Sequence, residues 1–180
     1  MTATALASLQ PALAGAEATL VMRSATSADA ASIQALIERH RVSGHLLPRT
    51  ESEIAGRAER FLVIVDDDVV AGCAELAPLS ASVAEVRSLV LDDQLRGMGL
   101  GRLLVDQLTR EAKLAGFRTI CAFTHEPGIF ARFGFSLVPH AWLPEKIGAD
   151  CAGCALFRRC GQSAMRLRLD QATAGLGACA

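Results

Sequence analysis

The sequence predicts an α/β (α+β) fold, a three-layer sandwich with a mixed central sheet. Two observations carry this prediction. Segments with the two-residue period of strands alternate along the chain with segments in which apolar residues recur at helical spacing. The chain has 180 residues, of which 51% are hydrophobic and 21% charged, so it can bury the core of one ordinary domain.

Two short motifs mark the starts of helices in the first half of the chain. Thr26 and Thr50 are each followed three residues later by an acidic residue, which is the pattern of a capping box. Apolar residues at helical spacing then predict a helix over residues 27–41, and a second, short helix opens at Thr50. Three aspartates at 66–68 predict a hairpin turn. The strands expected in this half are 19–23, 61–65, 69–76 and 83–91.

The apolar period changes in the second half. A helix is expected over residues 99–115 with Gly116 as its stop, and a short helix over 127–133 ends at Gly134. The leucines expected to form the buried stripe of the longer helix are Leu103, Leu104, Leu108 and Leu114. Further strands are expected at 118–124 and 164–169.

The remaining segments and the composition exclude several classes of protein. Residues 1–19 and 171–180 are rich in small residues and predict flexible tails around one domain at 20–170. A net charge of −1 gives no field for nucleic acid or a membrane surface, so neither is expected as a partner. No Lys or Arg precedes Arg23, which argues against a signal peptide. Six cysteines without a signal then predict reduced thiols and a cytoplasmic protein.

A glycine-rich loop lies between the expected strand 83–91 and the expected helix 99–115. Glycines let the backbone approach a ligand, and the free amides of a first helical turn favour a phosphate or pyrophosphate. Arg96 and Arg102 can add charge-assisted contacts. The spacing does not match the dinucleotide fingerprint, and the P-loop lysine is absent. A plain strand–helix turn is the alternative. The loop reads Arg96-Gly97-Met98-Gly99-Leu100-Gly101.

This loop resembles the central motif of the GNAT acetyltransferase superfamily, and the flanking segments 84–91 and 129–135 resemble that family's fourth strand and late helix. The resemblance implies two parallel strands that splay apart, near Leu89 and near 119–123, with acetyl-CoA as cosubstrate between them and no metal required for catalysis. It implies that the amides of residues 96–101 hold the pyrophosphate. It also implies that the backbone of Leu89, Val90 and Leu91 pairs with the pantetheine arm and the thioester.

A closer likeness is to short bacterial N-acetylglutamate synthases. It rests on the segments 44–49, 85–87, 130–135 and 143–146, the cysteines at 151, 154 and 160, and Ala164-Met165. The likeness implies transfer of an acetyl group to the α-amine of L-glutamate, the first step of arginine biosynthesis. A homodimer is compatible with the sequence, which by itself sets no oligomeric state.

The expected acceptor carries two carboxylates, so its site should present cations. Arginine binds a carboxylate through two parallel hydrogen bonds, and the candidates are Arg49 first, Arg87 second, and Arg132 in the short helix. Glu85, two residues before Arg87 on the same strand, is the candidate general base. The alternatives are that an arginine is a solvated surface charge, and that Glu85 only pairs with Arg87 or a neighbouring strand.

Other chemically active residues are weaker candidates. The chain contains no tyrosine, and Phe130 fills the position at which many GNAT enzymes place a tyrosine acid, so water is expected to protonate the leaving thiolate. His125 is a second candidate for a base, whereas His40 is expected to serve packing. Cys151, Cys154 and Cys160 have the spacing of metal ligands, and free or redox-sensitive thiols are the preferred interpretation.

Two other functions compete with the glutamate acetyltransferase. The first is acetylation of another amine, such as a different amino acid, a polyamine or a protein N-terminus. A polyamine site would be lined by carboxylates, whereas this chain offers arginines. The second is a non-catalytic acyl-CoA sensor, which the absence of tyrosine favours and the presence of Glu85 disfavours.

Overall fold

A computed structural model describes residues 20–41, 46–155 and 157–169 of the chain, and both predicted tails lie outside them. The strands form one seven-stranded sheet in the order β1-β2-β3-β4-β5-β7-β6. Pairing of β1 with β2 and of β2 with β3 is antiparallel, whereas β4 and β5 run parallel, so the predicted mixed sheet is confirmed. The strands are β1 (Leu20–Ser24), β2 (Phe61–Asp66), β3 (Val69–Pro78), β4 (Val83–Leu91), β5 (Thr119–Thr124), β6 (Ser136–Val138) and β7 (Ser163–Arg168).

The chain divides into two compact units, which are described separately. The first contains the residues up to Leu76 together with Arg87–Leu108, and the second contains Ala77–Val86 together with the residues from Thr109 onward. Strands β3 and β4 and helix α3 (Leu100–Leu114) contribute to both units.

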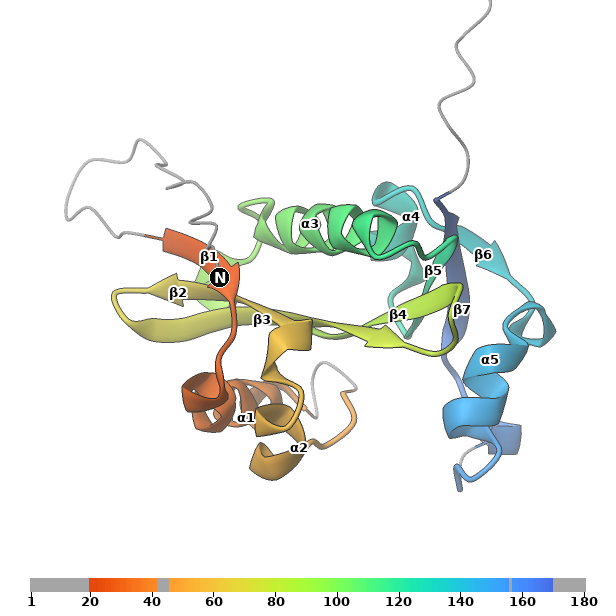
Figure 1. Cartoon of the computed structure of the whole chain (residues 1–180), viewed down its shortest axis with the longest axis horizontal. Helices are drawn as coiled ribbons and strands as arrows, with labels where there is room; N and C mark the ends of the chain where they lie inside the picture. Colours follow the sequence, from red (N-terminus) through yellow and green to blue (C-terminus); the bar gives the residue numbers. More distant parts are fainter. Residues whose placement is uncertain (1–19, 42–45, 156, 170–180) are drawn as a thin grey trace, which may run out of the picture. The chain divides into compact units, whose positions relative to one another are not determined.

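In the first unit, α1 (Ala30–His40) and α2 (Glu51–Ala55) lie on one side of the strands β1–β3, and the first part of α3 lies on the other (Figure 1). Both predicted capping boxes are present. The amide of Thr50 donates to Glu53 at 2.9 Å while the amide of Glu53 donates to the Thr50 hydroxyl at 3.2 Å. These reciprocal bonds satisfy amides that the helix itself leaves unused.

The core of the first unit forms where α1 and α2 cover alternate residues of β2. Phe61, Val63 and Val65 share a cluster with apolar residues of both helices, and the intervening Leu62 and Ile64 are also fully buried. Burying each such side chain contributes about 1.5–3 kcal/mol. A strand buried on both faces explains why this segment reads as a continuous apolar run.

In the second unit, β5 pairs with β7 over six residues and β7 pairs with β6 over three. The core cluster joins Val83, Cys121, Val138, Leu143 and Ala164. The helical segments are α4 (Pro127–Arg132), α5 (Pro144–Lys146), the 3₁₀ turns His140–Trp142 and Phe157–Arg159, and a π-helical turn Ile147–Cys151. Sequence periodicity did not predict β6 or the segments at 140–151, because each is too short to show a period.

Two sequence predictions about side-chain orientation are wrong. Leu114 is 88% exposed, because the buried positions of α3 recur every four residues and Leu114 falls two residues beyond the last of them. In β4, Ser88 has a φ of +49°, so the strict alternation expected over 83–91 is interrupted there. The buried residues of α3 are Leu100, Leu104, Val105, Leu108 and Ala112.

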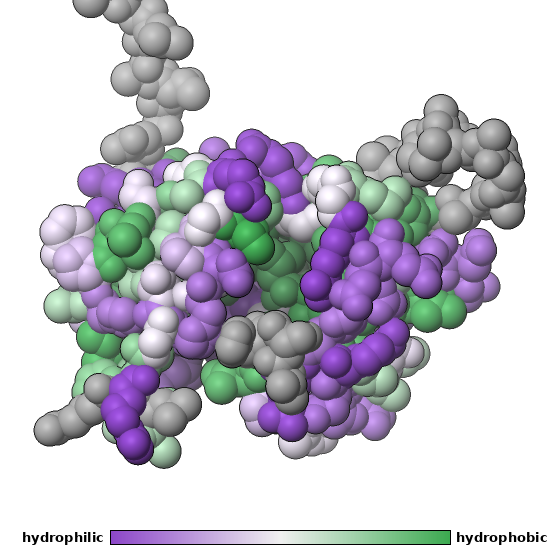
Figure 2. Space-filling view, turned by 180° about the vertical axis from the view of Figure 1, so that it is seen from behind, coloured by the Kyte–Doolittle hydropathy of each residue, from purple (hydrophilic) through white to green (hydrophobic). Residues whose placement is uncertain are grey.

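Polar side chains dominate the face of the molecule seen in Figure 2, and the hydrophobic residues on it form separate patches. None of the helices within the described residues is long and apolar enough to span a bilayer.

Candidate active site

The glycine-rich loop in the first unit has the geometry of an anion-binding turn. Gly97 and Gly99 have φ angles of +79° and +80°, a conformation that favours glycine. A Cβ added at either position would meet nothing within 4 Å, so the surroundings of these two glycines are open. The amide of Leu103 donates to the carbonyl of Gly99 at 3.1 Å, and the amides before it in the first turn have no acceptor within the helix. These amides can hold a phosphate or pyrophosphate.

A polar network ties this loop to the end of α1. The Nε2 atom of His40 lies 3.2 Å from Asp92 Oδ1, and a guanidinium nitrogen of Arg96 lies 3.3 Å from His40 Nδ1. Arg39 donates to the same Asp92 oxygen at 3.0 Å, and Arg96 pairs with Asp93 at 3.0 Å. His40 is buried, as predicted for packing, and it also bridges the helix to the residues that lead into the loop.

The two predicted loop cations are both exposed. Arg96 and Arg102 have side-chain exposures of 55% and 57%, and Arg102 pairs with Asp106 at 3.3 Å. Exposed ion pairs of this kind contribute about 0–1 kcal/mol, so either guanidinium can leave its partner for a phosphate at little cost.

The end of β4 carries the residues expected to contact the pantetheine arm. Val90 is buried, and Leu89 and Leu91 are partly buried. The strained Ser88 precedes them, and its carbonyl accepts a hydrogen bond from the Cys73 thiol at 3.4 Å. Burial, assisted by the charge of Glu75, raises the pKa of Cys73 to about 12, so this thiol stays protonated.

Glu85 lies in the second unit and is buried in an ion pair that sequence reasoning missed. The Nζ atom of Lys146 lies 2.8 Å from Glu85 Oε1 and 2.9 Å from Oε2, and it also donates to Asp150 at 2.8 Å. The side chains of Lys146 and Glu85 are only 10% and 4% exposed. Sixty-one residues separate the pair, so no local pattern could reveal it. The one available signal was a lysine within the segment 143–146 that carried the family resemblance.

The parallel pairing of β4 with β5 stops at Glu85. The ladder joins only Val83, Ala84 and Glu85 to the first three residues of β5, and Cys121 is the partner of Glu85. Lys146 Nζ also lies 5.3 Å from the centre of the Phe123 ring, which in turn contacts His140 at 5.3 Å. Glu85 therefore lies at the last paired position of the two parallel strands. It contacts Lys146, whose ammonium is also held by Asp150 and by the Phe123 ring.

The three predicted substrate arginines lie in different surroundings. The Nε atom of Arg49 is buried and has no hydrogen-bond partner among the described residues, while Gln34 donates to the Arg49 carbonyl at 3.2 Å. Arg87 is partly buried in β4 of the first unit. Arg132 is exposed in the last turn of α4 in the second unit. Of the three, Arg49 alone has a buried donor atom known to lack a partner in the described part of the chain.

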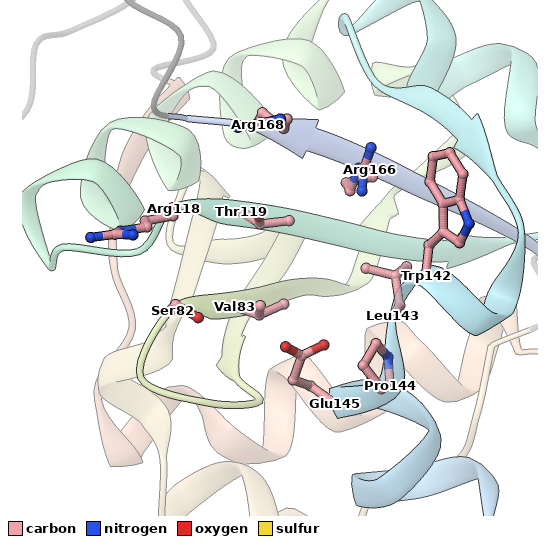
Figure 3. Close-up of a pocket in the computed structure, with 10 residues that line it drawn as sticks. All are labelled: Ser82, Val83, Arg118, Thr119, Trp142, Leu143, Pro144, Glu145, Arg166 and Arg168. Carbon is pink, nitrogen blue, oxygen red and sulfur yellow. The ribbon is translucent and has the colours of Figure 1, made fainter.

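A separate pocket of about 380 Å³ lies in the second unit (Figure 3). Its lining includes three arginines and Glu145, whose carboxylate points from α5 toward β4 and β5, while the Arg118 guanidinium points away from the other side chains. The Arg166 guanidinium stacks on the Trp142 ring at 5.0 Å. Glu85 and Lys146 do not line this pocket. Its lining residues are Ser82, Val83, Arg118, Thr119, Trp142, Leu143, Pro144, Glu145, Arg166 and Arg168.

The remaining candidates lie outside these sites. Cys151, Cys154 and Cys160 are free thiols, and the described residues hold no group of three or more His, Cys, Asp or Glu side chains arranged for a metal ion. Burial is the main cause that raises the pKa of Cys151. His125 is exposed beside Gly161. Phe130 is buried, with its ring against Phe135 at 5.3 Å, so it acts in packing.

The chain is similar to known acetyltransferases in sequence and in structure. Residues 30–135 match the acetyltransferase (GNAT) family. The chain is 31% identical to the uncharacterized N-acetyltransferase CT2212 of Chlorobaculum tepidum, over 80% of this chain and 93% of that protein. It is 28% identical to the amino-acid acetyltransferase of Mycobacterium tuberculosis, over 64% of this chain and 68% of that protein.

A solved structure supports the same assignment. The N-acetylglutamate synthase from Neisseria gonorrhoeae, complexed with coenzyme A and N-acetyl-glutamate, superposes with a TM-score of 0.75 and 25% identity. The match covers 87% of this chain and 37% of that one, so this chain corresponds to about a third of the longer enzyme. Together with the family match over more than half of its residues, these likenesses show that the chain belongs to the GNAT family of N-acetyltransferases.

Proposed function

We propose that this chain transfers the acetyl group of acetyl-CoA to the α-amine of L-glutamate, the first step of arginine biosynthesis, in the cytoplasm. The amino-acid acetyltransferase of M. tuberculosis and the N-acetylglutamate synthase of N. gonorrhoeae support this substrate class. The observation that carries it is the buried Nε of Arg49, which has no hydrogen-bond partner among the described residues, because a buried donor without an acceptor costs free energy unless a ligand supplies one. A glutamate carboxylate would supply that acceptor.

Acetyl-CoA is expected to bind through backbone groups. The amides that open α3 have no acceptor within the helix and follow Gly97 and Gly99, whose surroundings are open, so they are proposed to hold the pyrophosphate. The positive end of the 15-residue helix α3 and the exposed Arg96 and Arg102 add favourable electrostatics. The backbone of Leu89–Leu91 is proposed to receive the pantetheine arm, after the break in regular strand geometry at Ser88.

Glu85 is the proposed general base. The ammonium of the acceptor must lose a proton before its nitrogen attacks the thioester carbonyl, and a carboxylate can accept that proton directly or through a water. The nitrogen–carbon bond then forms, the carbon–sulfur bond breaks, and coenzyme A leaves as a thiolate. A thiol has a pKa of ~8.5, so the thiolate is an adequate leaving group that water can protonate, and the absence of tyrosine does not block the reaction.

The two carboxylates of the acceptor are proposed to bind to arginines, with Arg49 as the main partner and Arg87 and Arg132 as further partners. A guanidinium can form two parallel hydrogen bonds with a carboxylate, which a lysine cannot. A homodimer is proposed as the assembly.

The test is release of free coenzyme A thiol from acetyl-CoA with a panel of acceptors: L-glutamate, L-aspartate, L-glutamine, L-lysine and spermidine. Because Cys154 and Cys160 are exposed, the protein's thiols are blocked beforehand and a reaction without acceptor is subtracted. Glutamate should give the highest kcat/KM. Thiol release with spermidine or lysine but not with glutamate would remove the proposed substrate and keep the acetyltransferase. Binding of acetyl-CoA without release for any amine would favour the sensor.

A further inference from the structure

We propose that Lys146 is a positioning residue that orients Glu85 and keeps it ionised, with Asp150 moderating its charge. This inference rests on the proposed role of Glu85 as base. It concerns a residue that contacts Glu85 rather than the substrate.

The Lys146 ammonium is shared between two carboxylates, with hydrogen bonds to Glu85 Oε2 and Asp150 Oδ2. A lysine ammonium has three N–H groups, and Lys146 places its Nζ at 2.8 and 2.9 Å from the two oxygens of Glu85 and at 2.8 Å from Asp150 Oδ2. The charge of Lys146 is thus already balanced by two carboxylates of the protein itself. Lys146 therefore acts on Glu85, and the binding of an acidic acceptor falls to other cations.

The pair is held from several sides. Lys146 is the last residue of α5, and Asp150 lies in the π-helical turn that follows it. The ion pair between these two residues, which are four apart in the chain, helps to hold the ammonium in place beside β4. The ring of Phe123 lies 5.3 Å from Nζ on a third side. A lysine fixed in this way gives Glu85 a single orientation, because both carboxylate oxygens point at one nitrogen.

The charge balance around Glu85 has a direct consequence for proton transfer. A carboxylate buried without a partner takes up a proton, and a protonated Glu85 cannot act as base. Lys146 opposes this by favouring the anion. Asp150 accepts a hydrogen bond from the same ammonium, so two carboxylates share one positive charge and the hold of Lys146 on Glu85 is moderated.

The other titratable groups near the pair are weaker influences. Cys151 and Cys160 lie on the Asp150 side, where the charges of Lys146, Asp150 and Glu85 all act on Cys151. His140 contacts the Phe123 ring, and Arg166 lies on β7 opposite Cys121, which is itself the β5 partner of Glu85 in the ladder. Glu145 precedes Lys146 on α5 and lines the separate pocket. The direct contact of Lys146 with Glu85, at 2.8 and 2.9 Å, is the interaction on which the proposal rests.

The test is the pH dependence of kcat/KM between pH 5.5 and 9.5, with the best acceptor of the panel, in the wild type, Lys146→Met, Lys146→Arg and Asp150→Asn. At acidic pH, kcat/KM should fall as Glu85 takes up a proton, and this acidic limb of the profile should lie at least one pH unit higher in Lys146→Met. The variant should recover much of its activity at high pH. Lys146→Arg, which keeps the charge, should preserve the limb. Asp150→Asn should move it downward, because the lysine charge then acts on Glu85 alone.

A purely structural lysine gives a different result. It would lower the melting temperature and reduce kcat/KM by the same factor at every pH, without moving the limb, and this outcome would overturn the proposal. Asp150 is 39% exposed, so Asp150→Asn keeps the test valid if Lys146→Met does not fold.

A second readout does not depend on activity. Proteins labelled with ¹³C at the glutamate carboxyl carbons are titrated by NMR, and the Glu85 signal is assigned by its loss in Glu85→Gln. The titration midpoint of the Glu85 signal should move to higher pH in Lys146→Met and to lower pH in Asp150→Asn, as the acidic limb of kcat/KM does. An unchanged midpoint in these variants rejects the role of Lys146, whereas absent glutamate-dependent turnover in the wild type rejects only the proposed function.

Discussion

The glycine loop of the first unit and the Glu85 site of the second unit are built in opposite ways. The loop is six consecutive residues, and its two glycines with positive φ have open surroundings that leave room for a ligand. The Glu85 site is a buried side-chain pair whose members are 61 residues apart. A site made from consecutive backbone groups can be recognised in a sequence, whereas a site made by a distant side-chain contact needs the fold. The two sites should also fail differently when they are changed.

The largest effect is expected from Glu85→Gln. Removing the base should lower kcat by about 10²–10⁴-fold, the range of general acid–base catalysis, while the Kd for acetyl-CoA stays within about twofold. Glu145→Gln makes the same chemical change one residue from Lys146 and should leave kcat unchanged. Steady-state thiol release and calorimetric titration of acetyl-CoA provide both numbers. If Glu85→Gln keeps most of its turnover, Glu85 is not the base.

The next effect is expected from Arg49→Ala. Loss of a charged hydrogen-bond donor should raise the KM for glutamate by about 10–100-fold, since such bonds contribute about 1.5–3 kcal/mol. The Kd for acetyl-CoA should not move. Arg60→Ala, which removes an exposed arginine of the same unit, is the matched control. An equal rise in KM in both variants would show that overall charge, and not Arg49, matters to the acceptor.

A smaller effect is expected from Gly99→Ala. A left-handed residue other than glycine costs about 1–2 kcal/mol, and the new methyl group would occupy the space that the ligand needs, so the Kd for acetyl-CoA should rise about tenfold with little change in kcat. Gly116→Ala is a matched control, because Gly116 has a φ of +85° and equally open surroundings at the other end of α3. Both variants should lose similar stability. Equal Kd values in the two would reject the loop as the acetyl-CoA site.

The smallest effect concerns the stability of the first unit. Hydrogen bonds from Arg23, at 2.8 Å to each oxygen, hold the pKa of Asp29 well below its usual range. A depressed pKa contributes stability above the unfolded value of about 3.9, and that contribution is lost as the pH falls through the folded value. Asp29→Asn should therefore lower the melting temperature by a few degrees at pH 7 and by progressively less below pH 4. A difference that is the same at pH 7 and pH 3 would show that the carboxylate charge plays no part.

The sequence predicted the elements whose pattern is local. The capping boxes at Thr26 and Thr50, the strand–loop–helix unit around Gly99 and the mixed sheet are all present in the structure. The errors share a physical cause. Leu114 is exposed because burial of the last turn of a helix depends on what the fold places beside it, and Lys146 was missed because its partner lies on a distant strand. The positive φ of Ser88 was missed because serine is not a residue type that favours a left-handed conformation.

The most direct test of the account measures acetyl-CoA affinity and turnover side by side in Gly99→Ala and Glu85→Gln. The account predicts that the glycine variant binds acetyl-CoA about tenfold more weakly and turns over nearly normally at saturation, while the glutamate variant binds normally and loses at least about 100-fold in kcat. Weakened binding in Glu85→Gln with normal binding in Gly99→Ala would contradict the division of cosubstrate binding and chemistry between the two sites.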